Sequence, residues 1–329
     1  MIIGIETTAH TFGVAVVDHG KILCNVRDSY TTEKGGIIPM DAAKHHRNVS
    51  ETIFKKALEE AKIAEKEIKA IAISNAPGLA PCLSEGMKFA KKKAAELGLL
   101  LIPVNHCAAH LEIGRITGSK DPVLLYASGA NTQIIAYADG KYRVFGETLD
   151  IGIGNFLDNF ARYLGLGFPG GPKIMELGSK GKKFVELPYT IKGMDVAFSG
   201  LLTNVKQKYD ALQKKSVDYT KEDLAYSVQE TAFALLVEAS ERAMAHIGKK
   251  ELLLGGGVGC NTRLQEMCKK MCEARGAAFF APGNSLLIDN GAMIAYLGEI
   301  MFNHKIFFPA DEVDINPRER TDDVQVTWR

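Results

Sequence analysis

The chain has 329 residues, a net charge of +1 at pH 7, 46% hydrophobic residues and 24% charged residues, which are ordinary values for a globular protein. The balanced charge excludes a global field for capturing nucleic acid, so any such contact has to be local. Apolar runs break well before the ~18 residues that a membrane helix needs, so we expect no membrane span. The six cysteines form no Cys-x-x-Cys pair and the first residues do not resemble a signal peptide, which indicates a cytoplasmic protein.

Strands and helices alternate along the chain, which predicts an α/β fold. In the first half, short apolar runs predict strands at 2–5, 12–17, 21–28, 70–74 and 99–104. Longer amphipathic segments predict helices at about 40–62 and 82–97, the second of which ends at Gly98.

The same pattern restarts near residue 120. Strands are expected at 123–127, 132–138, 141–147, 251–254 and 278–280. Helices are expected at 155–164, 171–179, 201–214 and 221–247, then after the glycine loop at 255–259 as far as residue 274, and finally at 285–301. Ile3 to Gly20 has the same spacing as Val123 to Gly140, and both stretches run strand, Thr-containing turn, strand, Gly turn, strand. We interpret this as an internal duplication, with coincidence between two β-meanders as the alternative.

A duplicated chain predicts two lobes. We expect an N-terminal lobe at 1–119 and a C-terminal lobe at 120–299, with a tail at 300–329 that can pack back on the first lobe. No low-complexity linker separates the halves, so the lobes should be in tight contact, with a cleft between them.

His106 and His110 are the most informative pair of residues. Residues four apart lie on one face of a helix, so one metal ion can take both imidazoles. The pair follows an apolar strand, and α/β enzymes place their sites at the carboxyl ends of strands. Two partly buried helix histidines are the alternative reading.

Three turns that follow strands carry glycines or hydroxyls, at 4–8, 128–132 and 255–261. Glycine lets backbone N–H groups approach phosphate oxygens closely. The segment Gly-Gly-Gly-Val-Gly departs from the dinucleotide-binding fingerprint, and no P-loop motif is present. Each turn alone reads as a plain tight turn, but three in a duplicated frame favour a nucleotide cleft.

This combination resembles the actin, Hsp70 and sugar kinase superfamily. Longer motifs are similar to those of the universal tRNA adenosine threonylcarbamoyltransferase family, in its archaeal and eukaryotic branch, the catalytic subunit of the KEOPS complex. The resemblance covers essentially the whole chain, and its motifs lie at 104–110, 125–133, 147–155, 167–172, 198–202 and 288–293. It implies a duplicated two-lobe α/β fold with a nucleotide cleft between the lobes.

The resemblance also implies one metal ion, iron or zinc, held by His106, His110, Tyr126 and Asp289. Imidazoles suit either metal, whereas phenolate and carboxylate oxygens favour a harder ion such as ferric iron. The residues alone leave other readings open, since Tyr126 could be a core tyrosine and Asp289 a helix cap.

The implied donor is threonylcarbamoyl-AMP, and ATP is a further nucleotide that could bind. The reactive carbonyl of threonylcarbamoyl-AMP would lie near the metal and the loop formed by Ala127, Ser128, Gly129 and Ala130. Its adenylate would contact Asp158, Gly171 and Asn261. Relatives usually carry a glutamate where this chain has Met175. The resemblance is extended to Glu176, which lies one position later and would face elsewhere on a regular helix.

The implied reaction is attack by N6 of adenosine 37 of tRNA on the carbamoyl carbon, with AMP as leaving group. Glu6 could orient water or accept a proton, and an exposed carboxylate that merely supports its turn is the alternative.

The implied partners are tRNA and the KEOPS subunits, among them an atypical small protein kinase and a small dimerising subunit. The lysine clusters at 91–93, 182–183, 214–215 and 249–250 read better as solvated helix faces than as a tRNA track. No role is assigned to the pair His45 and His46.

Other functions remain open at this point. A zinc metalloprotease needs a glutamate beside the first histidine, where this chain has Cys107. A sugar or acetate kinase, or an ATP-binding regulatory ATPase of the same fold, would need no histidine pair for a metal.

Overall fold

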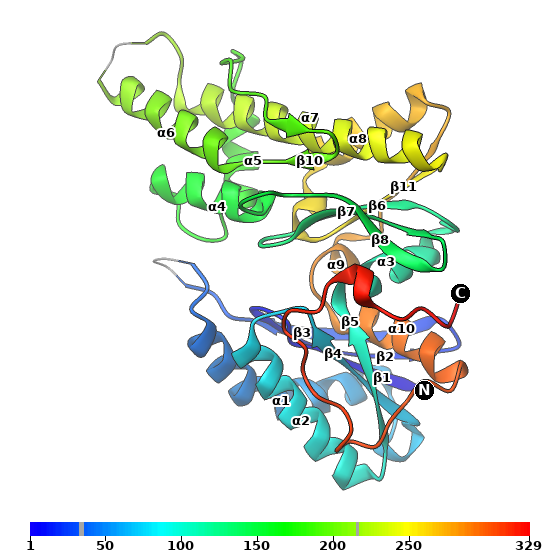
Figure 1. The fold of residues 1–329 in the computed structure, drawn as a ribbon. Helices are drawn as coiled ribbons and strands as arrows, with labels where there is room; N and C mark the ends of the chain where they lie inside the picture. Colours follow the sequence, from blue (N-terminus) through cyan, green and yellow to red (C-terminus); the bar gives the residue numbers. More distant parts are fainter. Residues whose placement is uncertain (33–35, 215–216) are drawn as a thin grey trace.

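The computed structural model describes residues 1–32, 36–214 and 217–329, and it forms two lobes that stack on each other (Figure 1). Within the described residues each lobe is built on a five-stranded sheet. The first sheet has the order β3-β2-β1-β4-β5. Its strands are β1 (Ile2–Glu6), β2 (Thr11–Asp18), β3 (Lys21–Ser29), β4 (Ala70–Ala76) and β5 (Leu100–Asn105).

The second sheet repeats this topology in the order β12-β11-β6-β7-β8. Its strands are β6 (Val123–Ala127), β7 (Thr132–Ala138), β8 (Lys141–Glu147), β11 (Glu251–Gly255) and β12 (Ala278–Phe280). In both sheets the first three strands pair antiparallel and the later two add in parallel. The matching hairpins turn at His19-Gly20 and Asp139-Gly140, four residues with positive φ, as a tight two-residue hairpin requires. The expected duplication is therefore confirmed.

The first sheet is covered on both faces. Ile3 and Ile5 of β1 pack with Phe54 of α1 (Pro39–Ala61) and with α2 (Ala80–Leu97), whereas Ile2 belongs to the core around α10 (Gly291–Asn303). Gly4 allows this close approach, because a Cβ there would lie 2.2 Å from the backbone nitrogen of Ala295. Alternate residues of a strand point to opposite faces, so burial of both faces explains why β1 is a continuous apolar run.

This placement of α10 differs from the expected lobe division. The helix lies within 120–299, but it packs against β1, β2 and β4 of the first sheet. We therefore propose that the first lobe consists of residues 1–119 together with α10 and most of the tail. The sequence of an apolar helix does not indicate which lobe it packs against. Only the tertiary contacts decide to which lobe the helix belongs.

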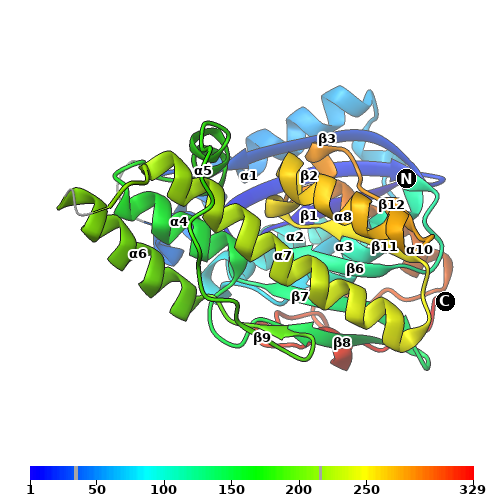
Figure 2. The same ribbon diagram turned by 90° about the horizontal axis from the view of Figure 1, so that it is seen from above.

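The helices of the second lobe lie partly over its sheet and partly to one side of it, as Figure 2 shows. They are α4 (Ile153–Tyr163), α5 (Gly170–Gly178), α6 (Ser199–Gln213), α7 (Lys221–Ile247) and α8 (Thr262–Ala274). The long helix α7 packs on β6, β7, β8 and β11. A short hairpin of β9 (Ile191–Lys192) and β10 (Asp195–Val196) was not anticipated from the sequence. On the other side of the sheet, toward the first lobe, lies α3 (His106–Glu112).

The helix expected at 285–301 is interrupted. The chain forms α9 (Asn284–Leu287), leaves helical geometry at residues 288–290, and resumes as α10. The Asn290 side chain stabilises this break: its oxygen accepts a hydrogen bond from the Met293 N–H at 3.0 Å, and its Nδ2 donates to the Ile288 carbonyl at 2.7 Å. An asparagine at the N-cap is a good helix start, so it begins a new helix where the apolar periodicity alone predicts a continuous one.

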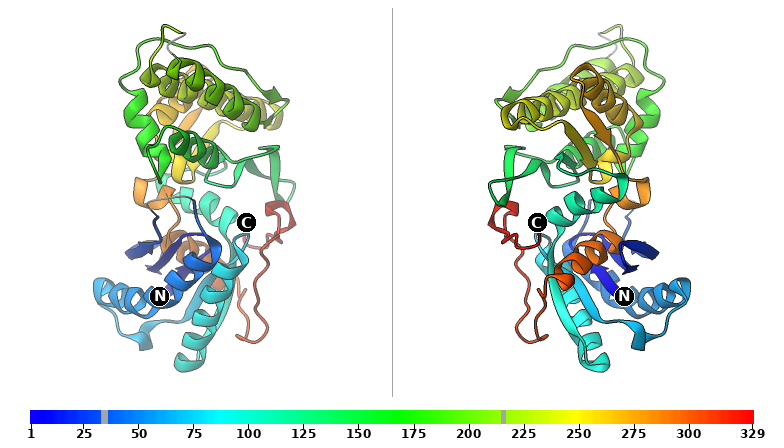
Figure 3. Two further views of the ribbon diagram at one scale, coloured as in Figure 1. Left: turned by 90° about the vertical axis from the view of Figure 1, so that its left-hand side faces the viewer. Right: turned by 90° about the vertical axis from the view of Figure 1, so that its right-hand side faces the viewer.

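The tail after α10 lies along both lobes (Figure 3). Phe308 exchanges backbone hydrogen bonds with Leu101 of β5, and Val313 joins the core of the first lobe. The tail then crosses to β8, where Arg320 forms an ion pair with Glu147. Within the described residues, no helix has the length and apolar character to cross a membrane.

Candidate metal centre and nucleotide cleft

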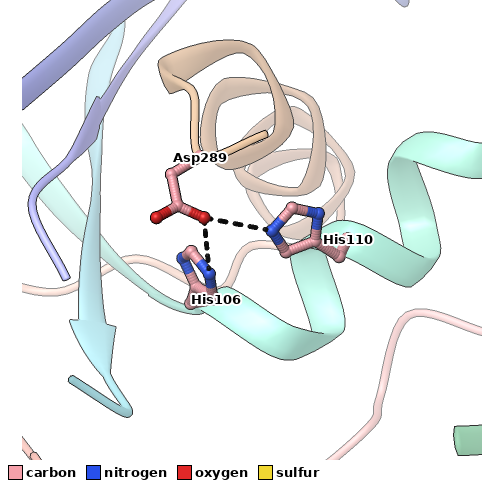
Figure 4. Close-up of side chains that lie close together, drawn as sticks. All are labelled: His106, His110 and Asp289. Atoms are coloured by element: carbon pink, nitrogen blue, oxygen red, sulfur yellow. Dashed lines mark ion pairs between the residues drawn. The ribbon is translucent and has the colours of Figure 1, made fainter. Parts of the chain in front are cut away.

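His106, His110 and Asp289 come together between the lobes (Figure 4). Helix α3 starts directly after β5, where Asn105 accepts hydrogen bonds from the N–H groups of Cys107 and Ala108 at 3.0 and 3.1 Å. This cap fixes the first turn of the helix, so both histidines point to the same side. One ligand atom from each of the three residues lies within 4.8 Å of the others.

Asp289 reaches the histidines because it lies in the break before α10. Its Oδ1 is 3.4 Å from His106 Nε2 and 3.6 Å from His110 Nε2. Burial opposes ionisation of this carboxyl, but the adjacent histidines hold its pKa well below the ordinary value. We expected the carboxylate on a helix, and this was wrong: it projects from a non-helical segment, which lets it turn toward α3.

Glu6 contacts the cluster from the opposite side. Its Oε2 is 3.0 Å from His106 Nδ1, and its Oε1 accepts hydrogen bonds from the Thr8 N–H and hydroxyl. The side chain is fully buried, so the alternative of an exposed carboxylate is wrong. A carboxylate on Nδ1 favours the tautomer with a proton there, which leaves Nε2 of His106 free to face Asp289.

His110 is buried, and within the described residues neither of its ring nitrogens has a hydrogen-bond partner. Burial lowers its pKa, which favours the neutral imidazole. A buried polar nitrogen without a partner is costly unless something else satisfies it. A metal ion bound by neutral His110, by Nε2 of His106 and by ionised Asp289 would do so, and the residues therefore fit the metal that the resemblance implies.

Tyr126 lies beside this cluster. Its hydroxyl is 2.9 Å from His106 Nε2, and its ring centroid is 4.8 Å from that of His110. On β6, Val123 and Leu125 face the helices of the second lobe, while Tyr126 faces the core around α3, as strand alternation requires. Burial raises the pKa of the phenol.

A cavity of about 320 Å³ extends from Asp289 into the second lobe. Several of the residues implied for adenylate binding line it: Ser128, Gly129, Asp158, Gly171 and Asn261. The glycine loop after β11 contributes Gly257. The strongest case for an approaching ligand is Gly171, because a Cβ built there would meet no atom within 4 Å.

Two of these side chains are already engaged. Asp158 accepts a hydrogen bond from the Gly170 N–H at 2.6 Å. Burial raises its pKa even so. Asn261 caps α8 through its oxygen and donates to Gln229 at 2.8 Å, so the site keeps less free hydrogen-bonding capacity at Asn261 than the sequence suggests.

Four other expected residues do not line this cavity: Tyr126 and Ala130 line a second cavity, described below, and Glu176 and Ala127 line neither. Glu176 is exposed and pairs with Lys180, whereas Met175 lines the cavity, so Glu176 faces away from it, as expected on a regular helix. One position on a helix is a rotation of about 100°, which is the reason. Ala127 is buried beneath the loop, with its carbonyl close to Gly256.

A second cavity, of about 510 Å³, opens from the same cluster. His106, Tyr126, Asp289 and Ala130 line it, as do residues that the sequence reading missed: His10, Asn155, Asn159, Arg162 and Phe168. Asn155, Asn159 and Arg162 lie at i, i+4 and i+7 on α4, and this helical spacing of polar residues was the signal available in the sequence.

Among the described residues, no member of the lysine clusters lines either cavity. Lys93 is buried and pairs with Glu51 and Glu96, and Lys249 pairs with Asp121. Residue 215 of the cluster at 214–215 lies outside the described residues.

The fold is shared with proteins of low sequence identity. HypF from Thermococcus kodakarensis matches with a TM-score of 0.65 and 16% identity, over 92% of this chain and 48% of that one. Component A of the Acidaminococcus fermentans (R)-2-hydroxyglutaryl-CoA dehydratase matches with a TM-score of 0.54 and 15% identity, over 90% and 97%. At such identities the likeness concerns the fold alone.

The sequence comparisons are more specific. The protein from Thermococcus sibiricus called tRNA N6-adenosine threonylcarbamoyltransferase is 53% identical over 326 residues, which is 99% of both chains. A probable bifunctional tRNA threonylcarbamoyladenosine biosynthesis protein from Methanosarcina mazei is 52% identical, over 99% of this chain and 59% of its own length. The family model described as TsaD, tRNA N6-adenosine threonylcarbamoyltransferase, matches residues 21–296. The chain therefore belongs to the tRNA N6-adenosine threonylcarbamoyltransferase family.

Proposed function

We propose that this chain transfers a threonylcarbamoyl group to N6 of adenosine 37 in tRNA, and that the transfer takes place at the cluster of His106, His110 and Asp289. The activity follows from full-length relatives at about half identity. The location rests on the convergence of three metal-type ligands where the two cavities meet. Within the described residues, buried His110 makes no hydrogen bond, and its Nε2 lies 3.6 Å from Asp289 Oδ1.

The donor in this proposal is threonylcarbamoyl-AMP, a mixed anhydride, with its adenylate in the first cavity. The loop at 127–130 and Gly171 would lie against it, and Asp158 would contact its ribose. The N6 amine forms a bond to the carbamoyl carbon, the bond from that carbon to the phosphate oxygen breaks, AMP leaves, and N6 gives up one proton. No protein nucleophile is required.

His106, His110 and Asp289, with Tyr126 beside them, would hold one metal ion. Bound there, iron or zinc supplies Lewis acidity for the carbamoyl carbonyl. Tyr126 adds a hard oxygen ligand, which favours iron. Glu6 would act as a positioning residue rather than as a base, because both of its oxygens already accept hydrogen bonds from Thr8 and His106.

The partners in this proposal are tRNA and the KEOPS subunits, including a small atypical protein kinase and a small dimerising subunit, in the cytoplasm. Since the net charge is +1, this chain alone offers few phosphate contacts, and partner subunits would supply the others.

The test uses purified chain, threonylcarbamoyl-AMP and unmodified tRNA, with and without the partner subunits. Nucleoside mass spectrometry should detect threonylcarbamoyladenosine with the native chain. His106→Asn and His110→Asn should lose both the product and the bound metal, measured by elemental mass spectrometry. The control His19→Asn removes an exposed histidine and should retain both. No product with every partner present would refute the proposal, and ATP turnover without transfer would assign the chain to the nucleotide-dependent ATPases or kinases of this fold.

A further inference from the structure

The second cavity has a different chemistry from the first. Gly129, Gly171 and Gly257, from three separate segments, line the first cavity, which suits a phosphate-bearing nucleotide. The second is larger and is lined by side-chain amides and one arginine from α4, facing apolar residues of the first lobe such as Ile37, Pro39 and Leu79. It therefore offers hydrogen bonds on one wall and an apolar surface on the other.

The two cavities meet at the metal cluster. The residues that line both are His10, Ser128, Gly129, Asp158, Phe168 and Asp289. His10 and Phe168 stand edge to face, with ring centroids 6.3 Å apart, and they border both spaces. A group in the first cavity and a group in the second can thus approach Asp289 from different directions.

A transfer reaction needs this arrangement. The leaving group and the attacking amine are both bulky nucleotides, so one space cannot hold both. With AMP leaving through the first cavity, the acceptor has to reach the carbonyl from another side, and the second cavity also exposes His106 and Tyr126.

Helix α4 presents polar groups to this second space. Arg162 is exposed and makes no ion pair within the described residues, and its guanidinium donates a hydrogen bond to Asn159 Oδ1 at 3.3 Å. The Asn159 amide donates to the Asn155 carbonyl at 2.8 Å, and both bonds are exposed, so RNA could replace them. Asn155 is also exposed and donates no side-chain hydrogen bond in the described part of the chain. Amides recognise the edges of bases, and an exposed guanidinium without an ion pair suits a backbone phosphate.

We propose that the second cavity is the acceptor site, which takes the target adenine and an adjoining phosphate of a single-stranded RNA loop. Asn155 and Asn159 contact the base, and Arg162 contacts the phosphate. An unstacked loop base can enter such a space at modest cost, and Phe168 offers a ring for it to stack on. This inference rests on the proposed function and adds which residues receive the RNA.

The test measures steady-state transfer with the complete set of partner subunits, varying tRNA and threonylcarbamoyl-AMP separately. Arg162→Ala should raise the KM for tRNA about tenfold and leave the KM for the donor unchanged. It should also reduce the salt dependence of tRNA binding, by about 0.7 in the slope of log affinity against log salt, as the loss of one phosphate contact to a single strand implies. Asn159→Ala should raise the KM for tRNA without changing that slope.

Arg143→Ala is the matched control, because Arg143 is an exposed arginine of the second lobe outside both cavities, and it should leave every value unchanged. If the native protein makes product but the Arg162 and Asn159 variants match it, the RNA enters elsewhere and the acceptor site is refuted. A raised KM for the donor instead would make this space part of the donor site, which also overturns the inference. If the native protein makes no product, the proposed function itself fails.

Discussion

Replacing Glu112 by glutamine should destabilise the whole chain, because Glu112 joins three parts of it. The carboxylate is fully buried at the end of α3. One oxygen lies 2.7 Å from Arg329 of the tail and 2.6 Å from the hydroxyl of Tyr142 on β8, and the other lies 2.5 Å from Arg115. Helix α3, the second sheet and the tail are thus joined at one charge.

The size of the effect follows from burial. Breaking a buried ion pair costs about 3–5 kcal/mol, because the remaining charge is left without its partner. Arg329 is 9% exposed and falls in this class, whereas Arg115 is 36% exposed and should contribute little. Glu112→Gln should therefore lower the free energy of unfolding by about 3 kcal/mol.

The assay is denaturation by urea, followed by circular dichroism, for Glu112→Gln, Arg329→Met and the double variant. We expect the two losses to be strongly non-additive, since they remove the same pair. Glu176→Gln is the control, because its pair with Lys180 is exposed and should be worth less than about 0.5 kcal/mol. A loss below about 1 kcal/mol for Glu112→Gln, or strict additivity with Arg329→Met, would refute this reasoning.

Two further predictions concern the first lobe. Gly4→Ala should cost at least about 3 kcal/mol of unfolding free energy, because the new Cβ would lie 2.2 Å from the backbone of Ala295. Gly200→Ala is the control: its Cβ would have open space around it, so the change should be neutral or stabilising in the same urea denaturation assay. Burial lowers the pKa of His46 to about 4, so the unfolded chain, with a pKa near 6.5, binds the proton more tightly. The free energy of unfolding should thus fall as the pH drops from about 6.5 to about 4, by up to about 3 kcal/mol from this residue. His46→Gln, which can still donate to the Ala9 carbonyl, should flatten this fall when urea midpoints are measured against pH. A pH profile that is the same in the variant and the native protein would contradict this prediction.

Local sequence predicted most of the elements, since each depends on neighbouring residues. Strands β6, β7 and β8 lie where alternation and turn residues placed them. The same is true of the hairpin at Asp139-Gly140 and of the helical spacing of His106 and His110. One error arose where a local cap competes with apolar periodicity: Asn290 starts a new helix within a segment whose periodicity predicts one continuous helix, and the break lets Asp289 face α3.

The sequence by itself thus determined the alternation of elements, the duplication, the family and the histidine pair, because these are written in residue spacing and in motifs. Only the tertiary structure decided which lobe α10 covers, that Glu6 is buried against His106, and that Arg162 lines a cavity. The physical reason is that each of these depends on groups far apart in the chain, whose proximity is set by how two sheets and their covering helices pack.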